Sequence, residues 1–123
     1  MRMIRSTVLG LSVLAAACGG SAESPEGEET SGGDLSQYEG PVASTDVDRG
    51  KEQFDNFCGD CHPDGEEDAG PSLIAEPHTP ARIRKQVREG SGRMRPMSAA
   101  RLSDDDLEAI LAYLGTINAV KSL

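Results

Sequence analysis

The segment CGDCH, residues 58–62, constrains the fold of this chain more than any other part of its sequence. Residues 45–123, where the helical patterns lie, contain only Phe54, Phe57 and Tyr113 as aromatic residues. A hydrophobic core of that size is marginal unless a disulfide, a metal or a bound group adds to it. We expect the two thiols and the imidazole of this segment to form or hold the group that stabilises the core.

Three kinds of site use two cysteines at this spacing. A thioredoxin-like dithiol usually lies near a βαβ pattern, and the sequence has no convincing strand. A structural zinc site needs four ligands at short spacings, and only His78 is left to join the segment. C-x-x-C-H is typical of covalent haem, with Cys58 and Cys61 bonded to the porphyrin and His62 reaching the iron. The pattern favours haem and leaves the other two interpretations weak.

Apolar residues at helical spacing predict three helices. The first covers about residues 46–57 and leads directly into the cysteines. The second follows Thr79 and Pro80, which suit a helix start, and ends near Gly90. The third begins after Ser103, whose side chain can cap it, and carries an apolar stripe to residue 117. An all-α domain is therefore predicted.

The N-terminus has the layout of a secretory signal. Arg2 and Arg5 precede a short apolar run, and small residues lead to Cys18. We interpret residues 1–17 as a lipoprotein-type signal peptide and Cys18 as the acylated first residue of the mature chain. An ordinary signal peptide that leaves Cys18 as a spare thiol is the alternative. Acylation also accounts for the odd number of cysteines.

Residues 18–44 are rich in Gly, Ser, Pro and Glu, and almost lack large apolar side chains. Such a composition cannot repay the entropy of ordering. The sequence therefore predicts a lipid-anchored flexible linker over 18–44 and a haem domain over 45–123. The domain would be exported, with a lipid anchor in the membrane, and would face the periplasm or the cell surface.

Three stretches together resemble the small monohaem class I cytochrome c domains of bacteria. They are RGKEQFDNFCGDCH at 49–62, GPSL at 70–73 and VREGSGRMRPMSAARLSDDDLEAILAYL at 87–114. The resemblance implies the cytochrome c fold, in which three main helices surround one covalently bound haem c. It also implies that Gly50 lies where the first and last helices cross, and that the Pro71 carbonyl accepts the ring N–H of the proximal histidine.

The resemblance places a methionine on the other face of the iron. The family usually has proline directly after this ligand, but the chain reads Met94-Arg95-Pro96-Met97. The distance from the following LSD motif implies Met94 as the axial ligand. Met97 is the main alternative ligand, and the remaining possibilities are His78 or an open sixth position. The ordinary role of a buried methionine is to fill the core.

The function that follows is electron transfer by a His/Met-ligated c-type cytochrome, with redox proteins as partners. The chain would be a carrier, not an enzyme, although it could serve as a subunit of an oxidoreductase. The alternative is a haem enzyme or a gas or redox sensor with a labile sixth ligand. A net charge of −9 argues against nucleic acid as a partner.

One segment of this acidic chain is locally basic. Between residues 82 and 95, basic side chains are opposed only by Glu89. This strip predicts either a surface that attracts an acidic partner, with Arg88 available to a haem propionate, or simple helix solubility. The basic residues are Arg82, Arg84, Lys85, Arg88, Arg93 and Arg95.

Overall fold

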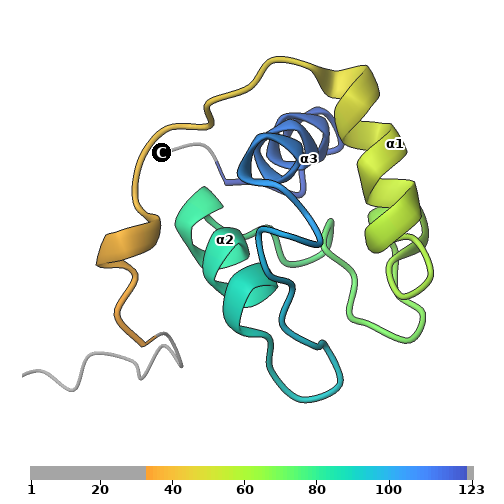
Figure 1. Cartoon of the computed structure of the whole chain (residues 1–123). Helices are drawn as coiled ribbons and strands as arrows, with labels where there is room; N and C mark the ends of the chain where they lie inside the picture. The colour runs from red at the N-terminus through yellow and green to blue at the C-terminus, as the bar shows by residue number, and fades with distance from the viewer. Residues whose placement is uncertain (1–32, 122–123) are drawn as a thin grey trace, which may run out of the picture. The chain divides into compact units, whose positions relative to one another are not determined.

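The computed structural model describes residues 33–121, and within them the chain is helical without named strands (Figure 1). The all-α prediction is confirmed, and the three main helices begin and end within one or two residues of the predicted bounds. The elements in chain order are η1 (Ser36–Tyr38), α1 (Val47–Phe57), η2 (Pro63–Gly65), α2 (Pro80–Glu89) and α3 (Asp104–Thr116).

The three α-helices begin where side-chain caps meet backbone N–H groups. Asp46, Thr79 and Ser103 each accept a hydrogen bond from the N–H of the residue three positions later. These bonds satisfy donors that a helix start leaves without partners. The acidic residues 104–106 add to the start of α3, because negative charge is favourable at the positive end of the helix dipole.

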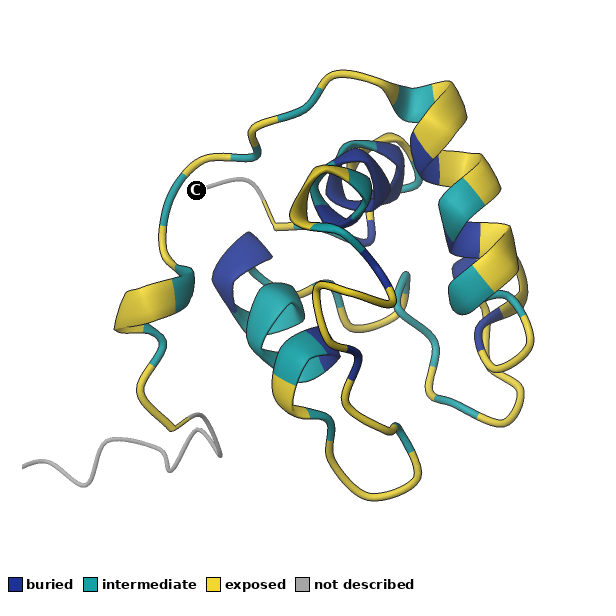
Figure 2. Ribbon diagram, in the orientation of Figure 1, coloured by how far each residue is buried: buried dark blue, intermediate teal, exposed yellow. Residues whose placement is uncertain are grey.

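The core is built mainly on the contact between α1 and α3. The two helices lie next to each other and cross, as Figure 1 shows. A Cβ atom at Gly50 would overlap the backbone carbonyl of Ala109, so glycine lets the two helices approach closely. One turn further on, the rings of Phe54 and Tyr113 pack with centroids 5.4 Å apart. Six of the thirteen residues of α3 are buried, and Figure 2 shows them in dark blue.

Helix α2 has no comparable contact with α1 or α3. Its largest contact with another helical element is the short η1. Of its side chains, only Val87 belongs to the buried hydrophobic cluster, with Ile83 partly buried against it. The protein part of the core therefore leaves α2 less supported than the other two helices.

Residues 38–43 contact the helical domain through Arg84. The Arg84 guanidinium donates to the carbonyl oxygens of Tyr38, Gly40 and Pro41, each at 2.9 Å. Its other two hydrogen bonds, at 2.7 and 2.9 Å, go to the carboxylate of Glu108 on α3. All five donors of the guanidinium are used. The final part of the segment predicted as linker is thus bound to α2 and α3.

No helix within residues 33–121 is long and apolar enough to cross a membrane. The predicted signal peptide, Cys18 and the first part of the linker lie outside the described residues.

Candidate functional site

Helix α1 delivers the chain directly into the cysteine segment. The N–H of Cys58 donates to the carbonyl of Phe54 at 2.7 Å, and the N–H of His62 donates to the carbonyl of Cys58 at 2.9 Å. These bonds place Cys58 and His62 about one helical turn apart. The segment therefore presents two thiols and an imidazole from one short, hydrogen-bonded turn.

The His62 ring is buried and held in one orientation. Its Nδ1 lies 2.9 Å from the carbonyl oxygen of Pro71, so the contact implied by the GPSL turn is present. Because a carbonyl can only accept, Nδ1 carries a proton, and in the neutral ring the lone pair is therefore on Nε2. A Cβ at Gly70 would overlap the ring, so the glycine leaves the space in which the imidazole lies.

Neither cysteine of the segment forms a disulfide. Cys58 is half-buried and Cys61 is exposed. Burial raises the pKa of Cys58 to about 12, with a smaller contribution from the neighbouring Cys61. A catalytic dithiol needs a depressed thiol pKa, because the thiolate is the nucleophile. The environment of Cys58 is thus the opposite of a thioredoxin-like site.

The zinc interpretation gains no further ligand from the fold. Within residues 33–121, no three His, Cys, Asp or Glu side chains converge to hold a metal ion. The backbone of His78 instead pairs with the C-terminal segment, donating to Ala119 and accepting from Lys121. The pKa of the His78 imidazole is lowered, mainly by burial and to a smaller extent by the positive charge of Arg82.

Met94 lies at the end of a tight turn. Ser91 and Met94 exchange two backbone hydrogen bonds of 2.9 and 3.0 Å. Gly90 and Gly92 have φ values of 66° and 56°, which other residues rarely adopt. The half-buried Met94 side chain packs against the edge of the core.

Met97 has a different environment. Its side chain is 7% exposed and belongs to the buried hydrophobic cluster with Val87 and Leu102. Its N–H donates to the carbonyl of Val87 at 2.8 Å, which fixes the loop against α2. This is the packing that a core-filling methionine makes.

Much of the basic strip is paired within the domain. Arg84 pairs with Glu108, Lys85 with Glu89, and Arg88 with Asp104. Arg88 also donates to the carbonyls of Met97 and Leu102, at 3.0 and 2.9 Å, and so supports the methionine loop. These contacts of Arg84 and Arg88 were not visible in the sequence, because they join residues between 9 and 24 positions apart, whereas Lys85 and Glu89 are only four residues apart.

The residues present fit a covalently bound haem. Two unbridged thiols and a buried imidazole with a free Nε2 are the donor set that c-type attachment requires. Haem would supply an iron centre that gains and loses one electron, while Cys58, Cys61 and His62 would hold it. Fold and donor set together define a small class I c-type cytochrome domain.

The comparison with protein families names the group. The family model described as cytochrome c oxidase, cbb3-type, subunit III matches residues 45–114, and the chain belongs to this family. Haem-based electron transfer is the function of such a domain. No curated protein and no solved structure matched the chain.

Proposed function

We propose that this chain is an electron carrier with one haem c, bonded to Cys58 and Cys61 and ligated by His62 and Met94. The observation that carries the proposal is the hydrogen bond from His62 Nδ1 to the Pro71 carbonyl. It fixes the ring orientation and the tautomer that leaves Nε2 as the basic nitrogen, as a metal-ligating histidine requires. With both axial positions filled by protein, the iron would exchange electrons without binding a substrate.

Met94 is the proposed sixth ligand because it is only half-buried at the edge of the core and its sulfur contacts the Gln86 amide, while Met97 is buried among apolar side chains. Thioether ligation favours ferrous iron and raises the reduction potential. The residues around both ligands would then exclude water and keep the iron low-spin in both oxidation states. A haem enzyme or a gas sensor would instead have a labile sixth ligand.

The test uses the full chain carrying haem. Wild-type ferric protein should be low-spin, should show the sulfur-to-iron charge-transfer band, and should bind neither cyanide nor carbon monoxide readily. Met94→Ala should remove the band and open the iron to both ligands, whereas Met97→Ala should keep the band. A wild-type protein that binds carbon monoxide freely would refute the carrier proposal in favour of a sensor or enzyme.

The second part of the proposal concerns location. We infer that Cys18 is acylated after export and tethers the domain to a membrane, with the haem in the periplasm or at the cell surface. The signal layout and the odd cysteine support this. Cys18→Ser should move the protein from the membrane fraction to the soluble fraction, and retention in the membrane would contradict the anchor.

The partner we propose is a membrane oxidoreductase, since the matched family is described as a subunit of a cytochrome c oxidase. Arg93, Arg95 and Arg101 are exposed and make no ion pair with residues 33–121, and they supply local positive charge for an acidic partner. Replacing all three with Gln should slow electron exchange with anionic ferricyanide and weaken its salt dependence. An unchanged rate would contradict this surface.

A further inference from the structure

The side-chain amide of Gln86 on α2 uses all of its polar atoms. Its Oε1 accepts a hydrogen bond from Arg82 Nη1 at 3.3 Å, and its Nε2 donates to Ser91 Oγ at 2.8 Å. The same Nε2 lies 3.6 Å from Met94 Sδ, within range of a hydrogen bond to sulfur. Because Arg82 can only donate, the amide oxygen must face Arg82 and the NH2 group must face Met94.

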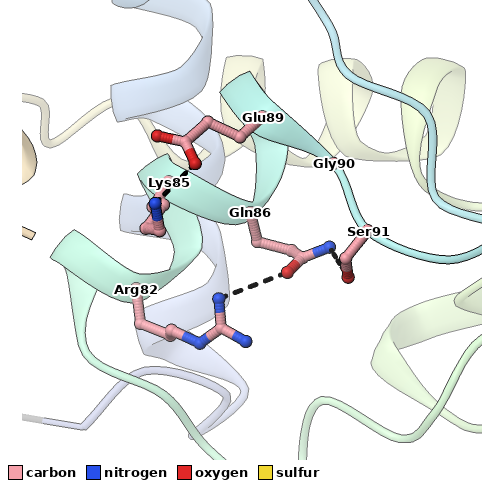
Figure 3. Close-up of a pocket in the computed structure, with 6 residues that line it drawn as sticks. All are labelled: Arg82, Lys85, Gln86, Glu89, Gly90 and Ser91. Carbon is pink, nitrogen blue, oxygen red and sulfur yellow. Dashed lines mark hydrogen bonds and ion pairs between the residues drawn. The ribbon is translucent and has the colours of Figure 1, made fainter. Parts of the chain in front are cut away.

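Figure 3 shows the hydrogen bonds of Gln86 with Arg82 and Ser91 beside a small pocket on α2. The four α2 residues at this pocket share one face of the helix, and on that face Lys85 pairs with Glu89 while Gln86 contacts Arg82 and Ser91. The Gln86 side chain is half-buried, so its contacts are partly screened from water. An amide that was only a surface group would be expected to point into solvent.

Gln86 also contacts both ends of the turn that carries Met94. Ser91 and Met94 are joined by two backbone hydrogen bonds, and the Gln86 NH2 group reaches the side chain of each. The backbone of Met94 is thus fixed by the turn, and its side chain is fixed by the helix. No other side chain within residues 33–121 donates a hydrogen bond to a methionine sulfur.

A thioether sulfur has two lone pairs. When one accepts an N–H donor, the other remains available to a metal, and its direction is set by the first contact. This parallels His62, where the bond from Nδ1 to Pro71 directs Nε2. The N–H donor also withdraws electron density from the sulfur, so it alters the strength of any bond that the second lone pair makes.

We propose that Gln86 is the positioning residue for the axial methionine. Its amide holds the Met94 sulfur, and it makes Met94 and not Met97 the sulfur presented to the iron. The inference rests on the proposed His/Met ligation. It adds a residue outside the ligand set that determines how firmly the sixth position is closed.

Gln86→Glu gives the sharpest test, because it keeps the shape of the side chain and an acceptor for Arg82 but has no N–H donor at neutral pH. Gln86→Leu removes both functions, and Met97→Leu is the packing control. In the haem-loaded full chain, both Gln86 variants should bind cyanide about two- to tenfold more tightly, the range that one neutral hydrogen bond corresponds to. Both should also shift the sulfur-to-iron charge-transfer band.

The outcomes separate this inference from the proposed function. If Met94→Ala removes the band while Gln86→Glu and Gln86→Leu match the wild type in band position and cyanide affinity, the ligation stands and the role of Gln86 is refuted. If Met97→Ala removes the band and Met94→Ala does not, both proposals fail. Rescue of the Gln86→Glu band on acidification, when the carboxyl regains a donor, would support the inference further.

Discussion

At the scale of single residues, the site depends on protein contacts that orient the side chains proposed as ligands. His62 is held by the Pro71 carbonyl, and Met94 by the Gln86 amide. A ligand that is already oriented loses less conformational entropy when it binds a metal, so such contacts strengthen ligation without touching the metal. Gly70 also contributes, because it leaves the space in which the His62 ring lies.

Gly70→Ala should displace His62. The added Cβ would overlap the imidazole, and the ring would have to turn away from the Pro71 carbonyl. We expect haem still bonded through both thiols but with a large high-spin fraction in the ferric visible spectrum. Pro71→Ala is the matched control, because it keeps the carbonyl, and it should stay low-spin. A low-spin Gly70→Ala protein would show that the ring has room the structure does not indicate.

The sequence indicated some of these residues and not others. The contact of Pro71 follows from the GPSL motif, which lies close to the histidine in sequence, whereas the space that Gly70 leaves for the ring is known only from the structure. The contact of Gln86 with Met94 was missed, because it exists only when the turn at residues 91–94 folds the chain back onto α2. A glutamine on a helix otherwise indicates only a polar surface, and no local signal distinguishes this one.

At the scale of elements, the helix bounds were predictable because each start carries its own cap. The close approach of α1 and α3 was predictable only through the resemblance, since a glycine within a helix is by itself unfavourable. The structure supplies the reason: Gly50 lies against the Ala109 backbone.

Gly50→Ala should destabilise the protein, and Gly115→Ala should not. At Gly50 the new methyl group would meet backbone that cannot move without separating the helices, so we expect a loss of about 1–3 kcal/mol in the free energy of unfolding. Gly115 on α3 has no neighbour within 4 Å of its ideal Cβ. There alanine should gain about 0.5–1 kcal/mol through helix propensity. Denaturant unfolding of both variants measures the difference, and equal effects would contradict the helix-crossing argument.

At the scale of the whole molecule, the segment before α1 is held to the helices mainly by the Arg84–Glu108 ion pair, and also by a hydrogen bond from the Tyr38 hydroxyl to Glu89. Composition predicted a linker up to residue 44 because it has few apolar groups, but polar bonds hold its last part to Arg84 and Glu108. Side-chain exposures of 11% and 16% show that this pair is largely shielded from water. A prediction from composition counts apolar side chains. It cannot detect that the backbone carbonyls of this segment accept hydrogen bonds from Arg84.

Acid should release this segment. Burial alone would raise the pKa of Glu108, but hydrogen bonds from Arg84 and the Ala43 N–H outweigh it and leave the pKa below its ordinary value of 4.5. The stabilisation is therefore fully present above pH 4.5 and is lost as the pH falls through the lowered value. Hydrogen exchange at residues 38–43 should accelerate below that value, and Glu108→Gln should reduce this pH dependence, leaving only the part that comes from Glu89 through the Tyr38 hydroxyl. Exchange that is independent of pH in the wild type, after correction for the intrinsic rate, would contradict the role of Glu108.

Haem should be needed most by α2. Helices α1 and α3 bury each other, whereas α2 contributes Val87 alone to the buried hydrophobic cluster and is otherwise held mainly by polar contacts of Arg84 and Arg88. A prosthetic group that binds only the folded state stabilises what it contacts, and a core this small has little stability of its own. In Cys58→Ala/Cys61→Ala protein made without haem, amides of α2 should exchange much faster than those of α3, and thermal unfolding should be broad.

Wild-type holoprotein is the reference, in which both helices should be protected together. Uniform protection and one sharp transition without haem would show that the polypeptide alone completes the fold.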